Sequence, residues 1–218
     1  MVPWLDPQLP VSFPDTHNAL DDPNGLLAAG GQLSSEWLLA AYRRGIFPWF
    51  NEGEPILWWT PAPRTVLLPE HFRTNRSFKR FLKACDYSIT RNERFADVMQ
   101  ACADPRPGQP GTWISLPMIH AYSELHRQGY AHSWECWDRD GLLIGGLYGV
   151  ALGRAFFGES MFSRADYASR LCLKQVVESG EYAMIDCQMS SDHLLRLGAQ
   201  DVSREQFEQW LDAYAAER

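Results

Sequence analysis

The residues best suited to chemistry lie in one short apolar segment, Ile185-Asp186-Cys187-Gln188. Side chains alternate along a strand, so a strand here would place Asp186 and Gln188 on one face and Ile185 and Cys187 on the other. Burying a carboxylate in an apolar strand costs free energy unless the carboxylate has a partner. Two interpretations of Asp186 stay open: a carboxylate directed into a functional site, or one half of a structural ion pair with an arginine.

A second carboxylate, Glu159, follows a short predicted strand over residues 155–157. In open β-sheets flanked by helices, the ends of the strands commonly border a ligand crevice. We therefore expect Glu159 to be a second acid near the site that contains Asp186.

Two nucleophilic mechanisms are alternatives at this site. The G-x-S pattern at 158–160 partly matches the turn of serine hydrolases, which would pair Ser160 with His193 and Asp186, but the final glycine of that pattern is missing. Cys187 is a candidate acyl-carrying thiolate, although a buried free cysteine is usually only a packing residue.

The only dense run of basic residues lies between Glu70 and Asp86, where no acidic residue interrupts it. Asn75 can cap a helix that extends to about Ala84. A solvated helix face is the usual reason for such a run, and a phosphate-binding surface is the alternative in an otherwise acidic chain. The basic residues are Arg73, Arg76, Lys79, Arg80 and Lys83.

Tryptophan is abundant, with nine in 218 residues. Tryptophan packs well in a core and also stacks on bases, so a core position is the default for Trp58, Trp59 and Trp113. Trp49 lies in a connecting segment and is the strongest candidate for an exposed stacking residue.

Charge and composition exclude several classes of protein. A net charge of −7 excludes a generally basic nucleic-acid binder, although a local basic patch can still bind RNA. Five cysteines without a C-x-x-C pair are typical of reduced thiols in a cytoplasmic protein. We find no signal-peptide pattern, no apolar stretch that could span a bilayer and no histidines at metal-ligand spacing, so we expect neither membrane nor metal binding.

The periodicity of apolar residues predicts helices first, then three strands, then alternating helix and strand, which is an α+β pattern with a mixed sheet. Ser34 and Gly45 bound the first helix, and Ser203 begins the last one with a capping box. Pro61-Ala62-Pro63 is a stiff connector, where we place a domain boundary. Further helices are expected at residues 75–84, 115–128 and 165–179, together with one that begins at residue 92 and a brief one that ends at residue 197. Strands are expected at residues 132–137, 142–150, 155–157 and 183–188.

Five motifs occur in an order and at spacings that together are specific. They are GIFPWF at 45–50, WWTP at 58–61, GTWI at 111–114, FGESMFS at 157–163 and IDCQ at 185–188. With these motifs the chain resembles the leucyl/phenylalanyl-tRNA–protein transferases, from about Pro23 to Gly198.

The resemblance implies an acyltransferase that needs no cofactor. Its donor would be Leu-tRNA or Phe-tRNA, and its acceptor would be a protein with N-terminal Arg or Lys. The added residue would mark that protein for degradation. The resemblance also implies a small N-terminal domain, residues 1–62, followed by a GNAT-like catalytic domain, residues 63–218. We expect a monomer, because no long heptad pattern or exposed apolar helix is evident.

The resemblance also implies roles for particular residues. Asp186 and Gln188 would be the central polar pair, with Glu159 beside them; Asp186 would attract the acceptor's amino group and Gln188 would orient it or the ester. Trp49 and Trp113 would flank the terminal adenosine, and the basic run from Arg73 to Lys83 would bind the acceptor stem. The pocket for the donor side chain would be lined by Leu147, Met161, Leu173 and Ile185.

Two other functions are alternatives. An acetyl-CoA-dependent N-acetyltransferase of the same fold would bind pyrophosphate near residues 163–169, but that stretch contains no glycine. A non-catalytic tRNA-binding module would not need Asp186 and Glu159, because acids near a phosphate site repel the ligand.

Overall fold

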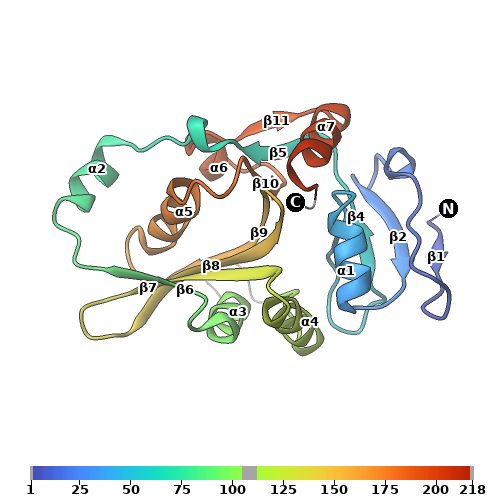
Figure 1. Cartoon of the computed structure of the whole chain (residues 1–218), viewed down its shortest axis with the longest axis horizontal. Helices are drawn as coiled ribbons and strands as arrows, with labels where there is room; N and C mark the ends of the chain where they lie inside the picture. The colour runs from blue at the N-terminus through green and yellow to red at the C-terminus, as the bar shows by residue number, and fades with distance from the viewer. Residues whose placement is uncertain (1, 105–111, 217–218) are drawn as a thin grey trace.

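The computed structural model describes residues 2–104 and 112–216, and its strands form two separate sheets (Figure 1). The smaller sheet has four strands in the order β1-β2-β4-β3, and the larger has seven in the order β11-β5-β10-β9-β8-β7-β6. The strands of the small sheet are β1 (Trp4–Leu5), β2 (Leu26–Gly30), β3 (Phe47–Pro48) and β4 (Leu57–Trp59). Those of the large sheet are β5 (Arg64–Leu67), β6 (Ser88–Arg91), β7 (Ala131–Trp137), β8 (Leu143–Leu152), β9 (Ala155–Ser163), β10 (Met184–Gln188) and β11 (Gln200–Val202).

The predicted helices are all found within the described residues. Ser34, Asn75 and Ser203 cap their helices as expected, because each side chain accepts a hydrogen bond from a backbone N–H of the first turn. Two helices begin later than predicted, since Asn92 and Tyr167 adopt left-handed backbone conformations, with φ of 63° and 62°. The helices are α1 (Ser35–Tyr42), α2 (Arg76–Leu82), α3 (Phe95–Ala103), α4 (Leu116–Arg127), α5 (Ala168–Glu178), α6 (Asp192–Arg196) and α7 (Arg204–Tyr214).

The three central strands that we predicted, β7, β8 and β9, pair as an antiparallel meander. The third strand is longer than we expected, since β9 continues from Ala155 to Ser163 instead of ending at Phe157. The expectation that Glu159 follows the end of this strand is therefore wrong. The polar residues resemble a loop in the sequence, but Ser160 and Ser163 pair with β8 on the far side of Glu159.

Several strands were not predicted, and β5 matters most among them. This strand follows the proline connector directly and lies between β10 and β11, antiparallel to both. Its four residues are all buried. A four-residue strand next to prolines carries too little periodic signal to be recognised locally. Its position brings Arg64 next to β10.

The large sheet has helices on both faces (Figure 1). One face is covered by α5, which contacts β7, β8 and β9, and the other by α3 and α4. The small sheet with α1 lies beside this layer, and α1 packs against α4. A single cluster of buried side chains extends from Leu27 and Trp37 in the N-terminal part to Val150 and Phe157 in the large sheet.

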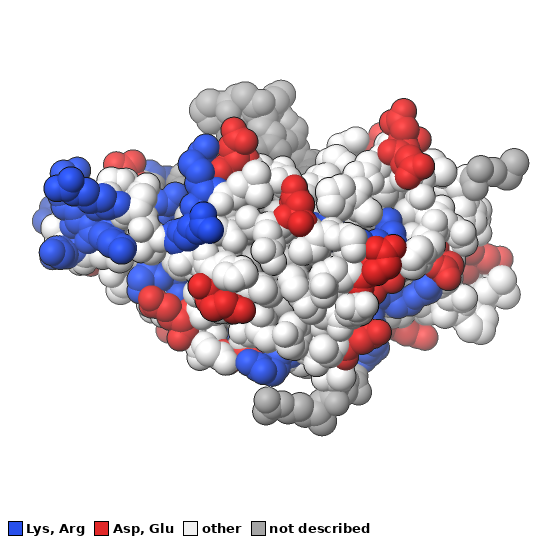
Figure 2. All heavy atoms as spheres, turned by 90° about the horizontal axis from the view of Figure 1, so that it is seen from above, with Lys and Arg blue, Asp and Glu red and all other residues white. Residues whose placement is uncertain are grey.

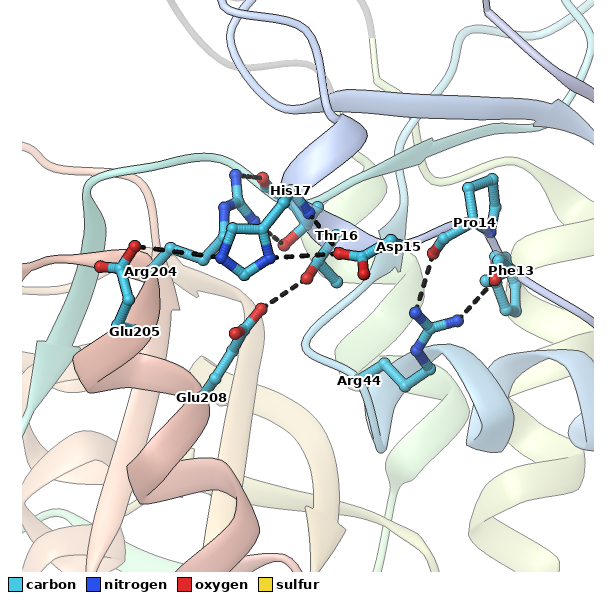
Figure 3. Close-up of polar contacts among 10 residues, drawn as sticks. Phe13, Pro14, Asp15, Thr16, His17, Arg44, Arg204, Glu205 and Glu208 are labelled. Carbon is cyan, nitrogen blue, oxygen red and sulfur yellow. Dashed lines mark hydrogen bonds and ion pairs between the residues drawn. The ribbon is translucent and has the colours of Figure 1, made fainter.

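Polar contacts join a segment near the N-terminus to the turn after α1 and to α7 (Figure 3). The Arg44 guanidinium donates hydrogen bonds to the carbonyl oxygens of Phe13 and Pro14, at 2.6 and 2.8 Å. The Thr16 hydroxyl donates to the Glu208 carboxylate in α7, at 2.5 Å. The first and last parts of the chain therefore hold one another in place.

The architecture is a mixed α+β fold, as predicted. The division into domains 1–62 and 63–218 stays a prediction. No helix among the described residues is both long enough and apolar enough to cross a bilayer.

A β-bulge interrupts the pairing of β8 and β9 at Glu159. Gly149 pairs with Gly158 and Tyr148 pairs with Ser160, so Glu159 is the extra residue on β9. A bulge redirects one side chain and is common beside active sites. Gly149 leaves room for it, because a Cβ atom there would lie 2.1 Å from the Phe157 carbonyl oxygen and 2.5 Å from the Phe156 ring.

We predict that Gly149→Ala lowers the free energy of unfolding by at least about 1 kcal/mol, because the backbone must move to admit the methyl group. Gly158→Ala is the matched control on the opposite strand, since its Cβ would make ordinary contact, 3.6 Å from the Asp186 carbonyl oxygen. Urea denaturation of both variants measures the difference. Equal losses in the two variants would contradict the tight packing that we describe at Gly149.

Candidate active site

Two adjoining pockets open at the edge where β9 and β10 lie side by side. The first, here called the apolar pocket, has a volume of about 180 Å³. The four residues expected to surround a donor side chain all line it: Leu147, Met161, Leu173 and Ile185. The second, here called the tryptophan pocket, has a volume of about 290 Å³ and is lined by Trp49 and Trp113 together with Phe47 and Met189.

The two pockets share a wall. Glu159, Cys187, Gln188 and Leu194 line both of them. Glu159 and Gln188 are the polar members of this shared wall. A ligand could place one end in each pocket. The atoms that link the two ends would then lie against the Glu159 carboxyl group and the Gln188 amide.

The Glu159 carboxyl group is held from behind by tyrosine. The Tyr122 hydroxyl donates to Glu159 Oε2 at 3.3 Å, and the Tyr42 hydroxyl oxygen lies 2.5 Å from that of Tyr122. Burial raises the pKa of Glu159 to about 7, and the nearby Asp186 charge raises it too, whereas hydrogen bonds from Tyr42 and Tyr122 lower it. Such a group can accept or donate a proton near neutral pH.

Gln188 adopts an unusual backbone conformation that points it into the shared wall. Its φ is 59°, and the pairing of β10 with β5 shifts between Asp186 and Gln188. Its backbone N–H donates to Asp186 Oδ1 at 3.0 Å, and its side-chain amide donates to Glu159 Oε1 at 3.5 Å. The regular alternation expected through this segment is therefore interrupted before Gln188.

Asp186 is completely buried and bound to Arg64. The guanidinium donates through Nε and Nη2 to the two carboxylate oxygens, at 2.8 and 2.7 Å. Arg64 itself lies between the rings of Phe47 and Phe207, 5.1 and 4.6 Å from their centroids. Asp186 lines neither pocket. The ion-pair interpretation describes this geometry, and Asp186 is hydrogen-bonded to the shared wall through the Gln188 backbone.

Comparison with known proteins identifies the family. The family model described as leucyl/phenylalanyl-tRNA protein transferase matches residues 66–212, and the model of that family's N-terminal domain matches residues 31–62. The chain belongs to this family. The family consists of transferases, so the chain is an enzyme of the aminoacyltransferase class.

Relatives of this name cover nearly the whole chain. The protein of Cellvibrio japonicus is 54% identical over 214 residues, which are 97% of this chain and 90% of the relative. That of Chromobacterium violaceum is 54% identical over 210 residues, 95% of this chain and 89% of the relative. Among solved structures, FemX matches with a TM-score of 0.50 at 12% identity, over 78% of this chain and 67% of FemX, which is a likeness of fold alone.

The structure does not support the two nucleophilic alternatives. Both oxygens of Asp186 bond to Arg64, and no hydrogen bond joins Ser160, His193 and Asp186 in the described part of the chain, so a serine triad is absent there. Burial raises the pKa of the Cys187 thiol to about 12, with the Asp186 charge adding to the effect. Cys187 is therefore protonated at neutral pH and is a poor nucleophile.

The basic run lies apart from the two pockets. Arg73, Arg76, Lys79, Arg80 and Lys83 are all exposed. Figure 2 shows lysine and arginine gathered at the end of the molecule that carries α2. Arg170 of α5 lies beside this end, with its guanidinium over the rings of Phe78 and Tyr167. None of the five basic residues lines the apolar or the tryptophan pocket.

The sequence did not reveal three residues that shape the site. Arg64 is 122 residues from Asp186 in the chain, and Tyr42 is 80 residues from Tyr122. Arg64 lies in a strand that was not predicted, and the two tyrosines lie on helices where an apolar ring is expected. Only tertiary contact shows that these side chains act on Asp186 and Glu159.

We predict that Asp186→Ala lowers the free energy of unfolding by about 3–5 kcal/mol, because the Arg64 guanidinium would stay buried without a counter-charge. The double variant Arg64→Met with Asp186→Leu should lose less, since it removes both charges. Denaturant unfolding measures each. Arg127→Ala is the control, because it breaks an exposed ion pair with Glu124, which water screens, so its loss should be much the smaller. An Asp186→Ala loss no greater than that of the control would refute the role of the buried pair.

We also predict a specific dependence of stability on pH. The pKa of Glu159 rises from 4.5 to about 7 on folding, so the folded protein binds this proton more tightly than the unfolded chain. The associated stability is fully present below about pH 4.5 and is lost as pH rises through about 7. The melting temperature of wild type minus that of Glu159→Gln should therefore decrease as the pH rises from about 4.5 through about 7. Parallel curves for the two proteins would contradict a raised pKa.

Proposed function

We propose that this chain transfers leucine or phenylalanine, and methionine as a third donor, from aminoacyl-tRNA to the α-amino group of proteins that begin with Arg or Lys. The reaction would mark these proteins for degradation by the bacterial N-end rule pathway, in the cytoplasm. The observation that carries the proposal is a shared wall with Glu159 and Gln188 between an apolar pocket and a tryptophan pocket, in a member of this family.

The apolar pocket suits a branched or aromatic donor side chain. Leu147, Met161, Leu173 and Ile185 offer no hydrogen-bonding side chain to a ligand. A polar donor side chain placed among these four residues would leave its own groups unpaired, whereas leucine and methionine would differ only weakly in affinity. We also propose that the domain that contains this pocket resembles the GNAT acyltransferases in fold.

The nucleotide end of the donor would lie in the tryptophan pocket. Trp49 is 40% exposed, and its ring packs edge-on against Trp59 at 5.4 Å. An exposed indole can stack on a base, so Trp49 and Trp113 would flank the terminal adenosine. The exposed basic residues from Arg73 to Lys83 would bind phosphates of the acceptor stem, which makes binding dependent on salt.

The chemistry follows from the position of the shared wall. The donor ester is already activated, so the enzyme has to position the amine, remove a proton and stabilise the developing oxyanion. Gln188 would orient the amine or the ester. Glu159 would take the ammonium proton as the new C–N bond forms. It would return a proton to the 3′-oxygen of the terminal adenosine as the C–O bond of the ester breaks. Asp186, bonded to Arg64, would act through the Gln188 backbone rather than on the acceptor directly.

The proposal includes no cofactor and a monomeric enzyme. The acetyltransferase alternative is weakened at the start of α5, where the Ser169 N–H already donates to the Ser163 hydroxyl at 3.2 Å. An anion bound there by backbone N–H groups would compete with that bond.

The test is transfer of radiolabelled leucine from Leu-tRNA to a peptide that begins with Arg, beside the same peptide beginning with Glu. We expect transfer that requires charged tRNA, is lost on ribonuclease treatment, and is reduced at least about tenfold in Gln188→Ala. Ser179→Ala, at the far end of α5, is the control variant and should leave the rate unchanged.

Radiolabelled acetyl-CoA in place of Leu-tRNA distinguishes the alternatives. Acetylation of the peptide without tRNA would replace the proposal with the acetyltransferase. Salt-dependent binding of tRNA without any transfer would favour the non-catalytic binding module.

A further inference from the structure

Three buried tyrosines, Tyr42, Tyr122 and Tyr148, lie near Glu159. Tyr42, Tyr122 and Tyr148 are all at most 1% exposed. Tyr42 and Tyr122 form a connected pair, with oxygens 2.5 Å apart, and Tyr122 donates to Glu159 Oε2. The Tyr148 hydroxyl is buried and has no hydrogen-bond partner within the described residues. None of the three lines the apolar or the tryptophan pocket.

The connected pair is rigid because each ring is packed on a different element. Tyr42 comes from α1 in the N-terminal part and lies 5.1 Å from the Phe157 ring of β9. Tyr122 comes from α4 and lies edge-on to Tyr148 at 6.0 Å. Rings confined in this way cannot turn their hydroxyls elsewhere without disturbing the core. The pair therefore presents a fixed donor to Glu159.

We infer that Tyr42 and Tyr122 are positioning residues for the transfer reaction: they fix one oxygen of Glu159 in the core and keep its carboxylate able to take the ammonium proton. The inference rests on the proposed function, which gives Glu159 that task. With Oε2 held by Tyr122, Oε1 faces Gln188 and the shared wall. The two hydroxyls thus orient the base without touching a substrate.

The groups around Glu159 act on its proton in opposite directions. Burial and the Asp186 carboxylate of β10 favour the neutral acid. The Arg64 guanidinium of β5 and the hydroxyls of Tyr42 and Tyr122 favour the carboxylate. The neutral Cys187 thiol and the neutral Tyr148 hydroxyl, which also face this region, carry no charge at neutral pH.

Removing one hydroxyl therefore has a predictable consequence. A carboxylate that loses a donated hydrogen bond in a buried site becomes a stronger base, so its pKa rises above about 7. At neutral pH a larger fraction of the molecules would then already carry the proton that Glu159 has to accept from the ammonium group. Transfer would slow at neutral pH and recover at higher pH, where the carboxyl is ionised again.

The experiment compares Tyr122→Phe and Tyr42→Phe with wild type, and uses Tyr148→Phe as the matched control. Tyr148→Phe removes a hydroxyl from the same core without removing a bond to Glu159. Rates of leucine transfer at saturating donor are measured from about pH 6 to pH 9, a range that spans the expected ionisation. In parallel, ¹³C-labelled glutamate side chains are titrated by NMR, with the Glu159 signal assigned by its absence in Glu159→Gln.

We expect the midpoint of the Glu159 titration, and the acid limb of the pH–rate profile, to move to higher pH in Tyr122→Phe and Tyr42→Phe but not in Tyr148→Phe. Transfer at pH 7 should fall at least about threefold in the first two variants, because less of the carboxyl is ionised. The acceptor's own amine titrates equally in all of them and cancels in the comparison.

An unmoved Glu159 titration in folded Tyr122→Phe overturns the inference, whatever the rates. An equal shift in Tyr148→Phe also overturns it, because that result would reflect loosened packing and not the loss of a bond. Absence of transfer in wild type would overturn the proposed function instead, and the NMR titration would still decide whether the hydroxyl pair controls Glu159.

Discussion

The site depends on one buried ion pair, that between Arg64 and Asp186. A charge removed from water is costly unless an opposite charge lies against it, and here both Asp186 carboxylate oxygens accept hydrogen bonds from the Arg64 guanidinium. Arg64 also lies between Phe47, from the small sheet, and Phe207, from α7. Strand β10, the small sheet and the last helix therefore meet at a single cation, and none of them can shift without exposing or unpairing it.

The geometry of the pockets follows from that constraint. Asp186 accepts a hydrogen bond from the Gln188 backbone, which holds Gln188 in a left-handed conformation that few residues other than glycine adopt. On the neighbouring strand, the bulge redirects Glu159 toward the same wall. Two irregularities in adjacent strands thus bring an amide and a carboxyl together between the pockets. The regular parts of the sheet supply the apolar lining, and the irregular parts supply the polar groups.

The sequence predicted what depends on local patterns. Ser34, Asn75 and Ser203 cap their helices because a cap involves only residues of one turn, and the motif order identified the family, which the comparisons confirm. The residues expected around a donor side chain do line one pocket, although their roles stay predictions. The full length of β9 was missed because glycine and polar residues in a bulge look like a loop. The partner of Asp186 was missed because Arg64 lies in a distant, short strand.

The position of Tyr42 in α1 limits which parts of two related proteins can be joined into one chain. The acidity of a group on the large sheet is set partly by Tyr42, a residue from the other side of the proline connector. A chimaera that joins the first 60 or so residues of one relative to the remainder of another would keep both folds only if the α1–α4 packing also matched. A large sheet joined to a foreign N-terminal part would therefore leave Tyr122 without its partner hydroxyl unless that part also supplied a tyrosine at position 42.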